Sequence, residues 1–217
     1  MTDWEGSAAR ATERHDDGLA RLPESPDERQ RELTRMGNAA WAAGLSLLML
    51  GREREAAVWL ERAADRYRES WPDAPPGSWG RPIGAMKACL IADDLDGARA
   101  DAQWALEAGA SESESPIGRY AAALAHVVLG EDGPAGELAA TLHGVRGFPQ
   151  AVADALGAVA AGDANGYDVA VRSLLADFES RDEFLEDITV ADTVLALQVL
   201  AAQRGLAVSL RSPLLPA

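Results

Sequence analysis

The chain has 217 residues and a formal net charge of -15, with 35 acidic and 20 basic side chains. A surface this acidic excludes nucleic acid and anionic membranes as partners, because a basic face must neutralise their charges. Hydrophobic residues make up 47% of the chain and aromatic residues only 6%, with alanine so frequent that we expect closely packed helices and an all-α fold.

Residues 3–22 predict an N-terminal helix, because apolar side chains recur every three or four positions and Pro23 follows. Ser25 and Pro26 then predict the start of a second helix, with a capping hydroxyl and a proline at the first helical position. Gly51 predicts its end, because glycine suits the left-handed conformation of a helix C-cap.

The next segment resembles a tetratricopeptide repeat. Small residues stand where the two helices of such a repeat touch, at Gly44, Ala56 and Ala63, and the turn falls at Leu50 and Gly51. Only glycine or alanine lets two helix backbones approach closely at a crossing. The equivalents of Ala56 in the following units are Ala98, Ala135 and, where a small residue is expected, Tyr167.

These patterns predict one domain over residues 1–217, of about ten helices in successive pairs. The prediction is a tetratricopeptide-like α-solenoid or a compact helical array. An extended C-terminal tail follows, because Pro213 and Pro216 prevent a helix. The expected elements are an N-terminal helix over 3–22, pairs over 26–70, 79–108, 115–145 and 149–179, and a last helix over 190–204.

The sequence contains few residues in patterns typical of a metal site or a catalytic site. His15, His126 and His143 lie far apart, outside any metal-ligand spacing. The single cysteine, Cys89, lies in an apolar run and predicts a buried, inert thiol. Phosphate-binding loops and nucleophile motifs are missing from the sequence. We therefore expect no catalytic residues, no cofactor, no metal and no enzymatic activity.

Binding residues are expected on the first helix of each pair, which lines the inner groove of a tetratricopeptide stack. Most of these positions are apolar. Lys87 is the only cation among them, so the groove is not expected to clamp an acidic peptide terminus. Two interpretations stay open: the residues are core covered by the N-terminal helix or the C-terminal tail, or they form a partner surface anchored by Trp41 and Tyr120. Together with the end of the preceding loop, the candidates are Trp41, Leu45, Trp79, Ile83, Lys87, Tyr120 and Leu124.

The C-terminal third resembles an all-α immunity-protein family of bacterial polymorphic toxin systems. The resemblance covers residues 150–217. It rests on the turn at Gly162 and Asp163, the aromatic Tyr167 with its following helix, and a last helix before a Leu-Pro terminus. The polar stretch 179–187 is shorter and more acidic than that family's usual segment. The resemblance implies a protein that neutralises a toxin by covering its surface.

The acidity has more than one explanation. An acidic inhibitor would be attracted to a basic toxin domain. An acidic surface with one lysine also fits a salt-adapted source, or a GC-rich genome that favours arginine codons. The competing functional class is a generic helical scaffold with another protein or peptide partner. Neither a signal peptide nor an apolar run of membrane-spanning length is recognisable, so we expect a cytoplasmic protein.

Overall fold

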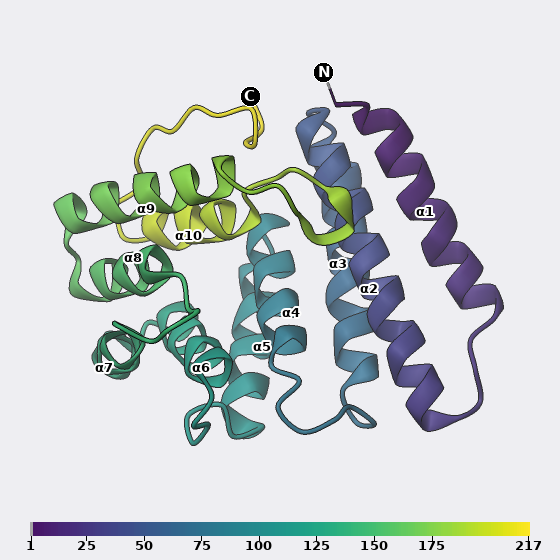
Figure 1. The fold of residues 1–217 in the computed structure, drawn as a ribbon, viewed down its shortest axis with the longest axis horizontal. Coiled ribbons are helices and arrows are strands. Elements are labelled where there is room, and N and C mark those ends of the chain that lie inside the picture. Colours follow the sequence, from purple (N-terminus) through teal and green to yellow (C-terminus); the bar gives the residue numbers. More distant parts are fainter. Residues whose placement is uncertain (1) are drawn as a thin grey trace.

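The computed structural model describes residues 2–217 and confirms the all-α prediction, with ten α-helices and one short 3-10 turn in that range (Figure 1). Each helix from α1 to α9 packs mainly against a neighbour in sequence, whereas α10 packs mainly against α4. The helices are α1 (Trp4–Ala20), α2 (Pro26–Met49), α3 (Glu53–Ser70), α4 (Gly80–Ile91), α5 (Leu95–Glu107), α6 (Pro116–Leu129), α7 (Asp132–Thr141), α8 (Gln150–Ala161), α9 (Ala164–Glu179) and α10 (Asp192–Ala202), and the 3-10 turn is η1 (Leu185–Asp187).

Most helix ends follow the predicted chemistry to within two residues, but the pair expected over 115–145 ends at Thr141. Pro26 is the first residue of α2, and Gly51 lies just after its end with φ of 72°. The Asp94 carboxylate accepts a hydrogen bond of 2.9 Å from the backbone N–H of Gly97 and so caps α5. The last helix is shorter than the expected 190–204, because Ala202 is followed by a turn that ends at Gly205.

The core is built largely from alanine, as the composition predicts. Ala56, Ala98 and Ala135 are all at most 1% exposed. At the crossing of α2 and α3, a Cβ added to Gly44 would lie 2.7 Å from the Leu60 side chain. The two backbones can come this close only because Gly44 has no side chain.

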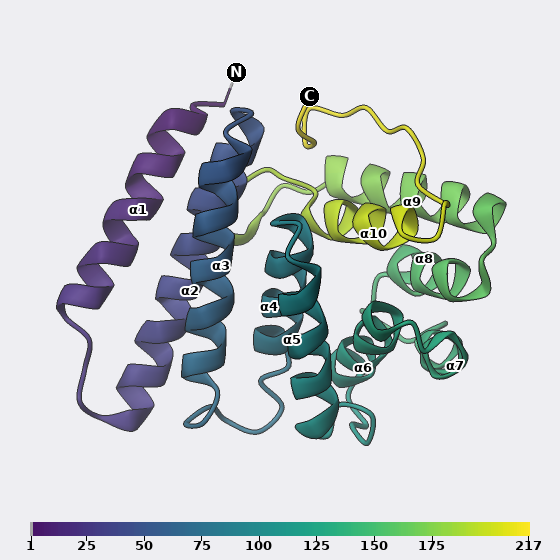
Figure 2. The same cartoon turned by 180° about the vertical axis from the view of Figure 1, so that it is seen from behind.

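Two views show how the elements are arranged. Helices α1, α2 and α3 lie side by side at one end, and α8, α9 and α10 lie at the other (Figures 1 and 2). The segment between α9 and α10 carries η1 across to α2, with which it is in contact. The tail after Gly205 is extended and lies along α9 and α10, held partly by a 3.0 Å hydrogen bond from the Ala191 N–H to the Leu214 carbonyl.

Candidate functional site

The sequence-predicted groove residues are mostly buried. Trp41, Leu45, Ile83, Tyr120 and Leu124 are each 9% exposed or less. The cover is neither the N-terminal helix nor the tail: η1 lies against α2, and α10 packs on α4. These residues therefore belong largely to the core. Part of their cover is η1, which lies in the polar stretch 179–187 that the sequence analysis interpreted as a boundary between helices.

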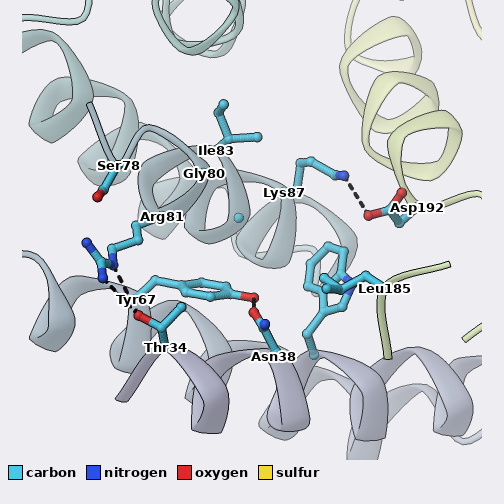
Figure 3. A pocket seen from close by; sticks show the side chains of 12 residues that line it. Thr34, Asn38, Tyr67, Ser78, Gly80, Arg81, Ile83, Lys87, Leu185 and Asp192 are labelled. Carbon is cyan, nitrogen blue, oxygen red and sulfur yellow. Dashed lines mark hydrogen bonds and ion pairs between the residues drawn. The ribbon is translucent and has the colours of Figure 1, made fainter. Parts of the chain in front are cut away.

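The structure nevertheless gathers three of the candidates around one open pocket. Trp41, Ile83 and Lys87 line a pocket of about 410 Å³ between α2, α3 and α4 (Figure 3). This volume lies within the range of small-ligand sites, roughly 300–1,000 Å³. The remaining lining residues are Thr34, Asn38, Tyr67, Ser78, Gly80, Arg81, Gly84, Leu185 and Asp192.

The other candidates lie elsewhere. Leu45 lines a smaller neighbouring pocket of about 240 Å³ behind η1, which it shares with Trp41 and Lys87. Tyr120 stacks at a tilt on Phe148, with ring centroids 5.8 Å apart. Leu124 and Trp79 are buried in the same core. Trp79 also packs on Trp71, at 5.7 Å, so these two side chains close the loop between α3 and α4.

Tyr67 forms the floor of the pocket of about 410 Å³. Its ring is held between two glycines: a Cβ at Gly37 on α2 or at Gly84 on α4 would lie 2.8 Å from it. The Tyr67 hydroxyl donates a 2.9 Å hydrogen bond to the side-chain oxygen of Asn38. Burial raises the pKa of Tyr67 well above its usual value, so the hydroxyl stays a neutral donor. In this part of the pocket the backbones of two helices thus enclose one ring.

Arg81 supplies the most unusual group in the pocket. The residue is only 7% exposed, and its guanidinium donates to the neutral side chains of Gln30 and Thr34. Its third nitrogen, Nη1, is buried and has no hydrogen-bond partner within residues 2–217. Burial lowers the pKa of Arg81 from its usual value. The pocket thus contains a desolvated guanidinium beside neutral acceptors.

Lys87 stands at the opposite end of the pocket and is neutralised. Its ammonium lies 2.6 Å from the Asp192 carboxylate and 2.9 Å from the Thr193 hydroxyl, at the start of α10. The same ammonium lies 5.4 Å from the Trp41 ring centroid, close enough for a cation–π contact. Lys87 therefore ties α10 to α4 and is already paired.

Residues 184–188 lie beside the pocket, and Leu185 contributes to its wall. Leu185 is 55% exposed at the mouth, while Ile188 is buried behind it. Glu186 has φ of 56°, a left-handed conformation, and its carboxylate lies 2.8 Å from the guanidinium of Arg14 on α1. Phe184 packs on Phe178 of α9, with centroids 6.3 Å apart. A short turn of the chain thus lies across α2 and is held by contacts with α1 on one side and α9 on the other.

A serine, a histidine and a glutamate also meet near the end of α6. The His126 ring lies 2.6 Å from the Glu131 carboxylate and 3.5 Å from the Ser111 hydroxyl. The distance to serine is at the outer limit of a hydrogen bond, and Ser111 is exposed on the loop between α5 and α6. We interpret these contacts as structural, because they hold the loop between α5 and α6 against the end of α6.

Sequence reasoning missed every polar residue of the pocket except Lys87, among them Thr34, Asn38 and Arg81. Thr34 and Asn38 continue the stripe of Trp41 toward the start of α2, at the same spacing of three to four, and this signal could have found them. Arg81 has no such signal, because its burial depends on Gln30 and on the arrangement of three helices. The pocket combines hydrogen-bond donors with apolar walls, which is the composition of a binding site.

Comparison of the chain with protein families, curated proteins and solved structures found no match. Within residues 2–217, no three His, Cys, Asp or Glu side chains are grouped so that they could hold a metal ion. None of the helices described for this chain has both the length and the apolar character needed to cross a membrane.

Proposed function

We propose that this chain is a non-catalytic protein-binding module that neutralises a toxin domain by covering its surface. The observation that carries the proposal is that the face formed by α2 and α4 already holds an irregular segment of this chain, the 3-10 turn η1 and its flanking residues. Leu185 and Ile188 lie along α2, and Asp192 pairs with Lys87 on α4. A face that binds a peptide-like segment in this way has the features of a protein-recognition groove.

The proposal includes a helical-repeat architecture of tetratricopeptide type. Each of the four helix pairs has a residue with positive φ in its turn, at Gly51, Asp93, Gly130 and Gly162. In every pair the residue five positions later is fully or almost fully buried in the second helix. This regular spacing supports repeated units rather than unrelated helix pairs. The buried residues are Ala56, Ala98, Ala135 and Tyr167.

Tyr167 departs from the small-residue rule for a reason visible in the structure. Its hydroxyl donates a 2.9 Å hydrogen bond to the Gln198 side chain on α10, and its ring is fully buried. In the fourth unit, α10 lies beside the helix pair. The Tyr167 side chain fills the space between that pair and α10, where a small residue would leave a gap. The departure is consistent with a repeat array closed at its end by a different helix.

The charge of the chain supports a basic partner. A net charge of -15 accelerates encounter with a positively charged domain and opposes encounter with an acidic one. The resemblance of residues 150–217 to immunity proteins indicates the same class of partner. The competing class, a generic scaffold, predicts a partner without toxicity.

Growth rescue tests the proposal. The partner is first identified by affinity capture from native lysate at the salt concentration of the source cell, because screening alters binding by so acidic a chain. The captured protein's domain is then expressed alone and together with this chain. We predict growth arrest by the domain alone and rescue by this chain. A harmless captured domain, or arrest that persists with the chain present, would contradict the proposal.

Two variants locate the binding face in the same assay. Leu185→Arg changes an exposed side chain at the mouth of the pocket, and Val58→Arg changes one that is 46% exposed on α3. Both substitutions add the same charge at a solvent-accessible position, so they match as a pair. We predict that Leu185→Arg weakens rescue and that Val58→Arg leaves it intact.

A further inference from the structure

Arg81 differs from Arg68, an arginine whose side chain is 36% exposed. Arg68 is met by a buried carboxylate, with its Nε 2.6 Å and its Nη2 2.8 Å from the two oxygens of Asp101. Arg81 is more buried and is met only by an amide and a hydroxyl. No carboxylate of residues 2–217 lies within 4.0 Å of its guanidinium nitrogens. The positive charge of Arg81 is thus uncompensated in this structure.

An uncompensated buried charge has a consequence for binding. Leaving a buried hydrogen-bonding group unsatisfied costs about 1–3 kcal/mol, and more when the group is charged. An anion that accepts hydrogen bonds from the guanidinium recovers this free energy when it binds. The protein as a whole repels anions, so an arginine that lines a pocket and is met only by neutral acceptors favours a specific anion over general attraction.

The rest of the pocket defines the body of such a ligand. Figure 3 shows Arg81 and Ser78 together at one end, with Lys87 and Asp192 paired at the other. The walls between the two ends are the Tyr67 ring and the side chains of other apolar residues. An organic group of aromatic or branched aliphatic character would bury its surface there. The apolar wall residues are Trp41, Ile83 and Leu185.

We propose that this pocket binds an organic monocarboxylate, with the carboxylate on Arg81 and its apolar body against Trp41, Tyr67 and Ile83. The planar fork of the guanidinium matches the two oxygens of a carboxylate better than it matches a neutral amide. The carboxylate belongs either to a free small acid or to the terminus of a polypeptide with an apolar last residue. The inference goes beyond the proposed function and stands whether or not the protein partner is a toxin.

Isothermal titration of the whole chain tests this site. The probes are 3-phenylpropanoate, its neutral amide, inorganic phosphate, and the dipeptide acetyl-Gly-Phe with a free or an amidated terminus. We expect one saturable site for the acids and at least about tenfold weaker binding of the matched amides, a difference of about 1.4 kcal/mol. The tighter of the two acids identifies the source of the carboxylate.

Two variants assign the binding to Arg81. Gln30→Glu places a carboxylate of nearly the same shape next to the guanidinium, so it should compete with the ligand while the fold is retained. We expect at least about tenfold weaker binding of 3-phenylpropanoate and a melting temperature no lower than that of the unmodified chain. Arg81→Gln should remove binding. Arg99→Gln, at an exposed arginine paired with Asp96, is the control and should bind normally.

Several results would overturn the inference. Equal affinity for acid and amide would remove the role of charge, and binding unchanged in Gln30→Glu would remove the role of Arg81. Phosphate binding tighter than either carboxylate would contradict the ligand class. The absence of saturable binding of both acids up to about 10 mM, weaker than any useful affinity, would contradict the site itself.

Discussion

Lys87 and Asp192 are 105 residues apart in sequence, yet the ammonium of one lies 2.6 Å from the carboxylate of the other. Their side chains are 11% and 18% exposed, so the pair is largely shielded from water. The contact joins α4 to the first residue of α10 and thereby fixes the C-terminal end of the segment that crosses α2. This pair holds one wall of the pocket in place.

Removing one partner of this pair should destabilise the fold unequally. Asp192→Asn leaves the Lys87 charge unpaired in the pocket and should lower the free energy of unfolding by roughly 1–3 kcal/mol. Lys87→Met should cost less, because Asp192 then remains at the positive end of α10 and the new side chain still packs on Trp41. Urea denaturation measures both, with Arg99→Met as the exposed control, and equal losses would contradict this explanation.

The pair Arg68–Asp101 gives a second stability prediction. Asp101 is 1% exposed and accepts two hydrogen bonds from Arg68, so Asp101→Asn should lower the free energy of unfolding by about 2–4 kcal/mol. Asp65 contacts the same guanidinium at 2.8 Å from an exposed position. Asp65→Asn should therefore cost less than about 0.5 kcal/mol. Similar losses for the two variants in urea denaturation would contradict the importance of burial.

The thiol of Cys89 predicts a pH dependence. Burial beside Asp101 raises the pKa of Cys89 to about 12, from an ordinary value of 9.0. Because the folded-state pKa is the higher one, the stabilisation is complete below pH 9 and is lost as the pH rises toward 12. The loss is about 1.4 kcal/mol per pH unit at most. Urea denaturation between pH 8.5 and about 10 should show this slope in the unmodified chain and a smaller slope in Cys89→Ala.

The tyrosines explain why that window ends near pH 10. Burial also raises the pKa values of Tyr67, Tyr120 and Tyr167, so all three add to the loss of stability at higher pH. Below about pH 9 they are neutral in both states, and between pH 9 and 10 they contribute equally to the unmodified chain and to Cys89→Ala, so the difference between the two slopes reports the thiol. Identical slopes for the unmodified chain and Cys89→Ala below pH 10 would contradict the assignment to the thiol.

The crossing of α2 and α3 gives a packing prediction. A Cβ at Gly44 would lie 2.7 Å from Leu60 and 3.2 Å from the Ala56 carbonyl oxygen. Gly44→Ala should therefore destabilise the fold by about 1–3 kcal/mol despite alanine's better helix propensity. Gly136→Ala in α7 meets nothing within 4 Å and should stabilise by about 0.5–1 kcal/mol. Thermal unfolding compares the two, and the same sign for both would contradict the close approach at Gly44.

Much of the fold could be predicted from local signals. Pro26, Gly51 and the alanine positions Ala56 and Ala98 act through the backbone and through helix contacts between sequence neighbours, which leave a readable pattern. The cover over α2 and α4 could not be predicted. Residues 184–188 carry no periodic pattern, and their place depends on contacts with helices more than a hundred residues earlier.

Some residues of the candidate site could likewise be predicted from the sequence and others could not. Trp41, Ile83 and Lys87 follow from helical spacing, although spacing alone does not tell a buried position from the wall of a pocket. Arg81 is the residue that sequence reasoning could not find. Its unpaired charge becomes visible only when Gln30 and Thr34, on another helix, are placed beside it.

The most direct test of the central claim is site-specific photo-crosslinking to the captured partner. A photoreactive residue replaces Leu185, at the mouth of the pocket, or Val58, on the outer side of α3. If the face of α2 and α4 is the binding face, the chain with the probe at 185 forms a covalent adduct with the partner and the chain with the probe at 58 does not. An adduct from position 58 without one from position 185 would contradict the claim.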